Sequence, residues 1–529
     1  MAIRDVLSAL DAMGDPAQRH QLAEGHLDEW DPEGELDDHE RQLVQAAAAG
    51  YPGGEVSSFA ALAGTATASG SVSGHVESGW FGAYGDAVRY TDSAYTEAWD
   101  GSPELAPRPA PLRATDPAQV AGAPSFAAFA ERCLYDDQTG YYSTGEVRFG
   151  TDGHFWTYPQ RMSPLFGAMV AESIRTVVDE WTWAGRLDDV DPLTILELGG
   201  GEGRLAIDVL DHVWSDTTET WAPYRHGMRY VLGDRSPAMR ERQSAALAES
   251  IEVGRAEVRT VDAVDVAWPG PFRGAIVANE LLDALVHECL RVDPDGRIVR
   301  VHVLETPTGR RELEVPLDWG WFDLDGRAGP RPAGLDDYLA RAVPIVEQVR
   351  DTGELPADLY WAPALPRLIE NLADILCRPG SLGVAMFIDY GDATIDGIDT
   401  DESRLRVYAV DQVHGHDPYR SPGTSDLTWD VDFGEVGRLA RANGLRVRFA
   451  GPQGALEVPP IDLASPAALD RLVPGREDEG ATAGPHALAA ALLLVNEFRA
   501  PSSGYRVMML APADVPFPDN AFGPRQRLG

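Results

Sequence analysis

Acidic residues and glycines meet at the end of an apolar run in TILELGGGEGRLAIDVL, residues 194–210. Glu197 lies near the end of that run. Three glycines follow it at alternate positions: Gly199, Gly201 and Gly203. Glycines at the end of a strand permit a tight turn and let a ligand approach the backbone closely. Because a second acid, Asp234, ends the next apolar run in YVLGDRSP, the pattern predicts a ligand site at two strand-to-helix turns.

The order of acid, glycines and second acid helps to choose between two classes of cofactor site. A dinucleotide site mainly requires the second acid, which binds ribose hydroxyls. Rossmann-like S-adenosylmethionine-dependent methyltransferases use both acids, the first near the methionine moiety and the second on the ribose diol. Asp262 falls where such proteins commonly contact the adenine amine, with Asp265 as an equal candidate. We therefore predict S-adenosyl-L-methionine as cofactor, with a nicotinamide-dependent dehydrogenase as the alternative.

A second group of polar residues has the chemistry to orient an acceptor. Methyl transfer from a sulfonium requires the nucleophile to be held close and aligned, and carboxylates pair bidentately with a guanidinium. Asn279 and Glu280 follow a predicted strand, and Asp283 comes one helical turn later, so that the two carboxylates can share a face. Asp389 ends another strand, and Asp426 lies in a DLT loop. The alternative is that Glu280 and Asp283 cap a following helix.

Histidines and aromatic residues extend the candidate cleft. His287 and His414 are the candidates for a proton acceptor, although a lone histidine more often has a structural role. An aromatic lid is one interpretation of four residues, and core packing is the other: Tyr141, Tyr142, Phe155 and Trp156. The predicted acceptor cleft then contains Tyr142, Phe155, Thr157, His414 and Asp426.

The elements that must position these residues alternate after residue 125. Buried strands are predicted at four short apolar runs, residues 194–198, 230–232, 275–278 and 384–388. Helical segments stand between them, which is typical of a mostly parallel sheet covered on both faces. Further strands at 445–449 and 505–510 are predicted to form an antiparallel edge. The predicted fold class is α/β, with a Rossmann-like core.

The composition divides the 529 residues into four parts. Residues 1–50 predict a small helical extension. Residues 51–124 are rich first in Gly and Ser and then in Pro and Ala, which predicts a flexible segment and linker. The α/β domain is placed at 125–515 and a tail at 516–529. The N-terminal part could serve dimerisation, recruit a partner, or carry a peptide substrate in cis within residues 51–120.

Charge and cysteine content limit the partners. There are 84 acidic and 44 basic residues, a net charge of -40, and every basic side chain is arginine. Such a polyanion repels nucleic acid. The three cysteines lack metal-ligand spacing and fit a reducing compartment. With no signal peptide and no apolar run of about 20 residues, the sequence predicts a cytoplasmic protein without a nucleic-acid, membrane or metal partner.

Ordered motifs along residues 125–515 resemble the MidA-like methyltransferases, a family that includes the arginine methyltransferase of mitochondrial complex I assembly. The resemblance rests on CLYDDQTGYYS, GHFWTYP, ELGGGEGRL, GDRSPAMRERQ, ANELLDAL, GELP, IDYG, PGTSDLTWDVDF and GPQG, in the family's order. It implies a Rossmann-like core, S-adenosylmethionine, and a protein or peptide side chain as acceptor, with arginine first.

The chain departs from the family pattern at His154, Tyr158, Asp234 and Val286. The first two belong to a segment expected to line the cleft. These departures favour, as alternatives, a biosynthetic methyltransferase acting on a small molecule or ribosomal peptide. A cofactor-binding assembly factor that works as a scaffold with little turnover is the alternative from another class.

Overall fold

The computed structural model describes residues 110–522, with gaps at 121, 145–163, 189–190, 216–218, 308, 320, 323–327, 330, 354, 393–404, 410–411, 414–416, 460–503 and 519–521. Three residues of the predicted cleft, Phe155, Thr157 and His414, lie outside the described residues. So do the predicted helical extension and most of the predicted flexible segment.

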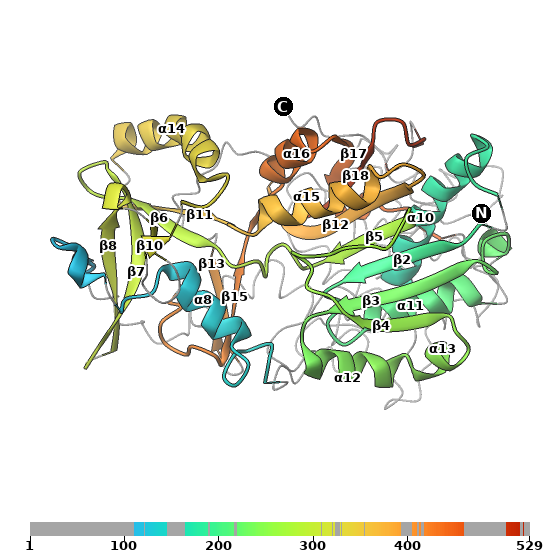
Figure 1. Cartoon of the computed structure of the whole chain (residues 1–529), viewed down its shortest axis with the longest axis horizontal. Coiled ribbons are helices and arrows are strands. Elements are labelled where there is room, and N and C mark those ends of the chain that lie inside the picture. Colours follow the sequence, from blue (N-terminus) through green and yellow to red (C-terminus); the bar gives the residue numbers. More distant parts are fainter. Residues whose placement is uncertain are drawn as a thin grey trace, which may run out of the picture.

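A large lobe is built on an eight-stranded sheet, on the right in Figure 1. Its five parallel strands are β2 (Leu193–Leu198), β3 (Met228–Asp234), β4 (Ala256–Thr260), β5 (Arg273–Asn279) and β12 (Leu382–Asp392). Antiparallel strands β18 (Tyr505–Pro512) and β17 (Leu445–Pro452) extend the sheet beyond β12, and β16 (Val431–Asp432) pairs with the end of β12. The predicted strands and the antiparallel edge are confirmed.

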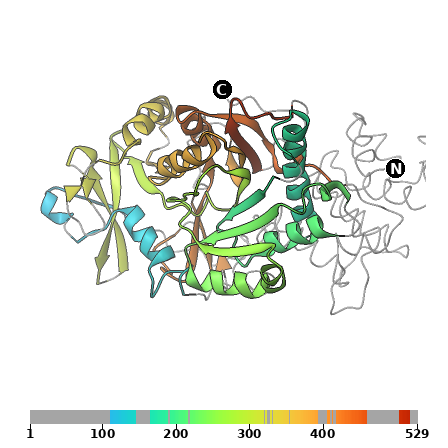
Figure 2. The ribbon, with the colours of Figure 1, turned by 45° about the vertical axis from the view of Figure 1, so that its right-hand side comes forward.

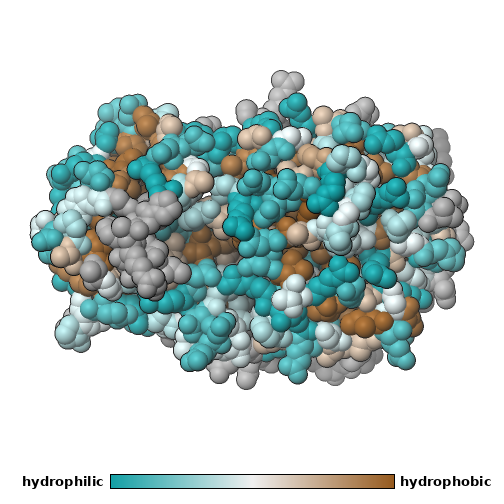
Figure 3. All heavy atoms as spheres, in the orientation of Figure 1, coloured by the Kyte–Doolittle hydropathy of each residue, from teal (hydrophilic) through white to brown (hydrophobic). Residues whose placement is uncertain are grey.

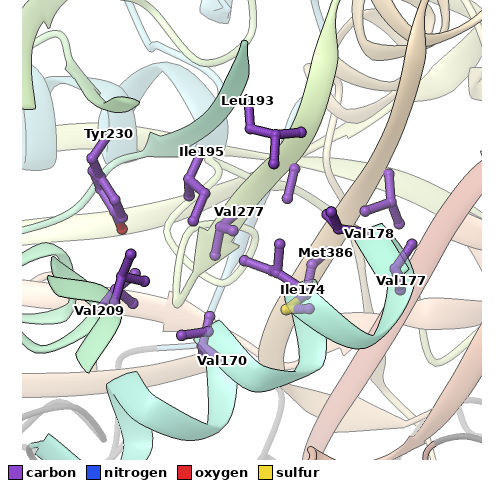
Figure 4. Packing of buried hydrophobic residues seen from close by; sticks show 14 of the residues in the cluster. Val170, Ile174, Val177, Val178, Leu193, Ile195, Val209, Tyr230, Val277 and Met386 are labelled. Atoms are coloured by element: carbon purple, nitrogen blue, oxygen red, sulfur yellow. The ribbon is translucent and has the colours of Figure 1, made fainter. Parts of the chain in front are cut away.

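Helices cover both faces of this sheet. One face packs against α10 (Pro164–Trp183) and α11 (Arg204–Trp214), and the other against α15 (Leu365–Leu376) and α16 (Phe433–Ala442). Because successive strand side chains point to opposite faces, Ile195 and Val277 meet α10 while Leu196 and Ile276 join the other layer. Figure 4 shows the first layer, in which residues of β2, β5 and β12 lie against Val170 and Ile174. The predicted α/β fold with a mostly parallel, doubly covered sheet is confirmed.

Between the glycine turn and β5 the chain forms the remaining helices of this lobe. These are η3 (Glu219–Trp221), α12 (Pro237–Ala246) and α13 (Ala248–Glu252). Ser236 caps α12, because its hydroxyl accepts a hydrogen bond from the Met239 amide, and Pro237 occupies the first turn. The start of α12 is therefore held directly after Asp234, at the end of β3.

A small lobe, on the left in Figure 1, interrupts the alternating pattern between β5 and β12. Its five-stranded sheet contains β1 (Leu112–Arg113), β8 (Gly309–Pro316), β7 (Ile298–Thr306), β6 (Glu288–Val292) and β11 (Ala357–Trp361). Beside it lie α14 (Leu335–Thr352), η4 (Leu317–Trp319) and the short pair β9 (Trp321–Phe322) and β10 (Ala328–Gly329). The sequence did not predict this sheet, because buried charged residues such as Arg300 and Glu314 interrupt its apolar runs.

The last described part of the predicted linker belongs to the small lobe. Leu112 pairs with Leu313 in a parallel ladder, η2 (Pro117–Gln119) follows, and Val120 and Ala123 are buried. The linker expected up to residue 124 is therefore wrong for these residues, whose apolar side chains pack on the sheet. Likewise Phe517 and Phe522 of the predicted tail pack on the core of the large lobe.

A helix and a short sheet lie where the two lobes meet. α8 (Phe126–Tyr135) shares one apolar cluster with β13 (Leu405–Ala409) and β15 (Ser425–Trp429), and β14 (Gln412–Val413) pairs with β13 in the same short sheet. In Figures 1 and 2 the end of α8 lies beside α12, and Met239 of α12 belongs to the same cluster. Figure 3 shows the surface hollowed between the lobes, with hydrophobic residues on the floor of the hollow. Turn η6 (Gln453–Ala455) completes the described elements.

Candidate functional site

The glycine turn after β2 has the conformation that its sequence predicts. Three glycines adopt left-handed backbone angles, with φ of +69°, +53° and +85°: Gly199, Gly201 and Gly203. At Gly200 a Cβ atom would lie only 2.7 Å from Cδ of Glu197 and 2.8 Å from Leu232. Since side chains do not fit there, the backbone itself forms the surface at the start of α11.

Glu197 lies beneath this turn and is 1% exposed. The Tyr230 hydroxyl donates a hydrogen bond of 2.8 Å to Oε2 of Glu197. Burial raises the pKa of Glu197 to about 7. Glu197 is therefore a buried carboxyl group packed directly under Gly200 and hydrogen-bonded to β3.

Asp234 ends β3 beside the glycine turn. Its Oδ1 accepts from the Ser236 amide at 2.8 Å, and its Oδ2 accepts from Gln243 Nε2 at 2.9 Å. The same Gln243 nitrogen donates to the carbonyl oxygen of Gly201 at 2.7 Å, so one buried amide ties the acid to the turn. Burial raises the pKa of Asp234. Gln243 was missed as a functional residue, although it stands in the quoted motif GDRSPAMRERQ.

The structure separates the two candidates for an adenine contact. Asp262 lies 3.9 Å from Arg235, the residue after Asp234, whereas Asp265 pairs with Arg367 of α15 at 2.5 Å. Asp262 thus lies beside the predicted cofactor turn, and Asp265 is held by a helix on the opposite side. This placement favours Asp262, whose contact with adenine stays a prediction.

The segment after β5, which carries the first two acceptor acids, forms a turn instead of the expected helix. β5 ends at Asn279, and Glu280 adopts a left-handed φ of +47°, which costs about 1–3 kcal/mol in a residue other than glycine. The Glu280 amide still donates to the Ile388 carbonyl of β12 at 2.8 Å. No helix follows among the described residues 280–287, so the expectation that Glu280 and Asp283 share or cap a helix is wrong. The loop runs directly into β6 of the small lobe.

Asp389 holds this loop in place. Its Oδ2 accepts from the amides of Leu282 and Asp283, at 2.9 and 3.2 Å, and its Oδ1 accepts from the Tyr390 amide. Burial, with the charges of Asp283 and Glu280, keeps the pKa of Asp389 well above its usual range. The predicted catalytic role of Asp389 is untested, and these contacts give it a positioning role.

Asp283 and Asp426 complete an acidic cluster, defined here as Glu280, Asp283, Asp389 and Asp426, in which the three aspartates are buried and Glu280 is half-buried. The Tyr390 hydroxyl donates to Oδ2 of Asp283 at 2.7 Å. Burial and then the charge of Glu280 raise the pKa of Asp283 to about 8, and burial raises that of Asp426 to about 7. Asp426 lies in strand β15 rather than in the expected loop. Its two oxygens each lie 2.9 Å from the hydroxyl of Tyr142, which belongs to the predicted cleft.

Two oxygens near this cluster lack a hydrogen-bond partner among the described residues. They are Oδ1 of Asn279 and Oδ1 of Asp283, both buried. A ligand with several N–H donors could satisfy them. His287 has a different environment, since its ring stacks on Trp429 at 4.9 Å and its Nδ1 lies 2.6 Å from the Leu285 carbonyl oxygen. These contacts favour the structural alternative for His287.

Residues 174–451 match the family model described as "Putative S-adenosyl-L-methionine-dependent methyltransferase". The chain belongs to this family. A structure from Burkholderia thailandensis bound to S-adenosyl-homocysteine shares the fold of this methyltransferase, with a TM-score of 0.56 and 22% identity over 77% of this chain and 93% of that chain. A dehydrogenase is thereby excluded, and S-adenosylmethionine is the cofactor.

Curated relatives include the protein arginine methyltransferase NDUFAF7 homolog, mitochondrial, of Drosophila melanogaster. It is 30% identical over 62% of this chain and 68% of its own length. The Mus musculus protein arginine methyltransferase NDUFAF7, mitochondrial, is 27% identical over 64% and 70%. Because these relatives are mitochondrial, the expectation of a cytoplasmic protein is wrong. Among the described residues no helix is long and apolar enough to span a membrane.

The described residues of this methyltransferase fit its cofactor. The open backbone of the glycine turn and the acids at the ends of β2 and β3 lie at the carboxyl edge of a parallel sheet, where such folds bind ligands. Asp234, held by Gln243 and the Ser236 amide, has oxygens suited to a ribose diol. The individual contacts remain predictions, as do the homodimer and the absence of a nucleic-acid partner.

Proposed function

We propose that this methyltransferase methylates an arginine side chain in a protein or peptide. The observation that carries the proposal is the acidic cluster at the carboxyl ends of β5 and β12. The hydrogen bonds of its members Asp283, Asp389 and Asp426 come from tyrosine hydroxyls and backbone amides. The names of the curated relatives, protein arginine methyltransferases, support the same acceptor.

The electrostatics of the cluster suit a guanidinium group. Burial raises the pKa values of Asp283 and Asp426 to about 8 and 7, because ionised carboxylates are costly without water or a cation. A guanidinium that enters the cluster stabilises the ionised carboxylates, so the carboxyl groups release protons when it binds. Its planar set of N–H donors also matches the two buried oxygens of Asn279 and Asp283 that lack a hydrogen-bond partner among the described residues.

The reaction then needs orientation more than covalent help from the protein. When bound, S-adenosylmethionine supplies an electrophilic methyl group on a positive sulfur. Glu280 and Asp283 would hold the guanidinium so that one nitrogen points at that methyl group. That nitrogen would form a bond to the methyl carbon as the sulfur–methyl bond breaks and S-adenosylhomocysteine leaves. It would then lose one proton, for which Oδ1 of Asp283 is the acceptor in this proposal. Asp389 keeps the loop that carries both acids in position.

The proposal is tested with S-adenosylmethionine carrying an isotope-labelled methyl group. The purified chain is incubated alone and with protein extract of its own source, and labelled amino acids are identified by mass spectrometry after hydrolysis. We expect labelled methylarginine in an acceptor protein. Label within residues 51–120 of the chain itself would identify those residues as the peptide substrate.

Two variants make the outcome specific. Glu280→Gln removes a charge of the cluster, and Asp265→Asn removes an exposed charge that pairs with Arg367 outside it. Methylarginine should disappear with the first variant and persist with the second. Label on another amino acid or only on small molecules would overturn the arginine assignment. Binding of S-adenosylhomocysteine without any transfer would favour the scaffold alternative.

A further inference from the structure

The motif CLYDDQTGYYS folds back on itself and pairs two tyrosines. The Asp136 side chain accepts from two backbone amides of the turn after α8, and a Cβ atom on Gly140 would lie only 2.4 Å from the Asp136 nitrogen. The Tyr142 amide donates to the Leu134 carbonyl at 2.9 Å, which returns Tyr142 to the end of α8. The rings of Tyr135 and Tyr142 stack with centroids 5.6 Å apart and planes inclined by 20°.

One side of this tyrosine pair contacts the residues that follow the predicted ribose acid, Asp234. The Arg235 guanidinium lies over the Tyr135 ring, 3.9 Å from its centroid. The Ser236 hydroxyl donates to the Tyr142 carbonyl at 3.0 Å, while the Ser236 amide donates to Asp234 at 2.8 Å. Both contacts join the start of α12 to the tyrosines, so a movement of the turn after Asp234 would also move the tyrosine pair.

The other side of the pair contacts the acidic cluster. The Tyr142 hydroxyl bonds to both oxygens of Asp426 at 2.9 Å. The Tyr135 hydroxyl donates to the carbonyl of Ala284 at 2.7 Å, directly after Asp283. The chain before β15 can pack closely against the turn that precedes Tyr142 because residue 423 is glycine. A Cβ atom on Gly423 would lie 2.4 Å from the carbonyl oxygen of Thr139 in that turn. The pair therefore contacts two separate segments of the acceptor site, strand β15 and the loop after β5.

We propose that Tyr135 and Tyr142 are positioning residues that couple cofactor binding to the geometry of the acceptor acids. When the cofactor binds Asp234, it restrains the turn at Arg235 and Ser236. Through their contacts with this turn, the tyrosines then restrain Asp426 and the loop that contains Asp283. Because such coupling is reciprocal, order at the acids also strengthens cofactor binding. The inference rests on the proposed function, in which those acids hold the acceptor.

Hydrogen–deuterium exchange with and without S-adenosylhomocysteine tests this coupling in the full chain. Tyr142→Phe keeps the ring and the backbone bond and loses only the hydroxyl contact with Asp426. In the wild type we expect the ligand to slow exchange both at the glycine turn and in peptides covering 425–429. In Tyr142→Phe the slowing at the glycine turn should remain, and the slowing at 425–429 should fall by about 5-fold or more.

A matched control separates coupling from local stability. Tyr419→Phe removes another tyrosine–carboxylate bond, the one to Glu312 at 2.9 Å, in the same apolar cluster but outside the link. It should leave the ligand effect at 425–429 unchanged. Tyr135→Phe, which loses the Ala284 bond, should weaken the ligand effect at 282–288 and serves as a second test if Tyr142→Phe does not fold.

Two outcomes would overturn the coupling. One is a wild type in which the ligand changes nothing at 425–429. The other is a Tyr142→Phe variant that exchanges faster there by the same factor with and without ligand, which a merely structural tyrosine would give. If the exchange results appear as expected but no methylarginine forms, the coupling stands and the arginine acceptor fails.

Discussion

Asp283→Asn should make the unfolding of this methyltransferase less sensitive to pH. Asp283 is 4% exposed, and burial followed by the charge of Glu280 raises its pKa from 3.8 to about 8. A folded-state pKa above the unfolded value means that the folded protein binds the proton more tightly. The resulting stabilisation is fully present below the unfolded pKa of 3.8 and is lost as pH rises through about 8.

The size of the effect follows from the two pKa values. Between pH 5 and pH 8 the wild type should lose on the order of 4 kcal/mol of unfolding free energy through this one group. The asparagine does not ionise and still offers an oxygen to the Tyr390 hydroxyl, so the variant should not lose this part of the unfolding free energy as pH rises. In a domain of this size the difference corresponds to a shift of roughly 5 °C in Tm between wild type and variant.

Differential scanning calorimetry at several pH values between 5 and 8, without cofactor, measures this shift. The Tm of Asp283→Asn relative to the wild type should rise as pH rises. Asp265→Asn is the control, because Asp265 forms an exposed pair with Arg367 that contributes at most about 1 kcal/mol. Parallel pH profiles for wild type and Asp283→Asn would refute the argument, since Asp283 would then be ionised in the folded protein throughout.

Three further predictions concern the site. Asp234→Asn should weaken binding of S-adenosylhomocysteine by about tenfold or more in isothermal titration, because a charged hydrogen-bond acceptor is lost, and an unchanged Kd would remove Asp234 from the ribose site. Gly200→Ala places a Cβ atom 2.7 Å from Glu197 and should lower the unfolding free energy in urea by about 1–3 kcal/mol, whereas a neutral result would mean that the turn yields easily. For the arginine acceptor, kcat/KM should fall toward low pH as Asp283 and Asp426 become protonated, from pKa values of about 8 and 7, and a flat profile between pH 6 and 9 would contradict their role.

Local patterns were enough to predict where the candidate cofactor residues lie in the fold, at the ends of two neighbouring strands. A strand, a glycine turn and a helix are neighbours in the chain, so Glu197 and the glycines are brought together by a few consecutive residues. Asp234 follows from the same rule one strand later, because adjacent parallel strands end at the same edge. Gln243, which ties these two turns together, gave no separate signal, since a glutamine on a helix is usually exposed.

The sequence predicted which acidic residues are candidates for the acceptor site, but it did not predict their contacts with one another. Asp389 looked like a catalytic acid and is bound to backbone amides of a loop more than 100 residues away. Asp426 looked like a loop residue and lies in a strand. The small lobe was missed because its strands bury Arg300 and Glu314, which apolar periodicity does not recognise.

The sequence by itself determined the parallel α/β core, the cofactor turn and the presence of acidic residues at strand ends, because these depend on short-range periodicity and on the conformational freedom of glycine. Only the tertiary structure decided which acids share one cluster and which tyrosines reach them. Tyr142 and Asp426 are separated by 284 positions, and their contact depends on the packing of α8 against β15. Burial then sets the charge of that cluster, a property that belongs to no single segment of the chain.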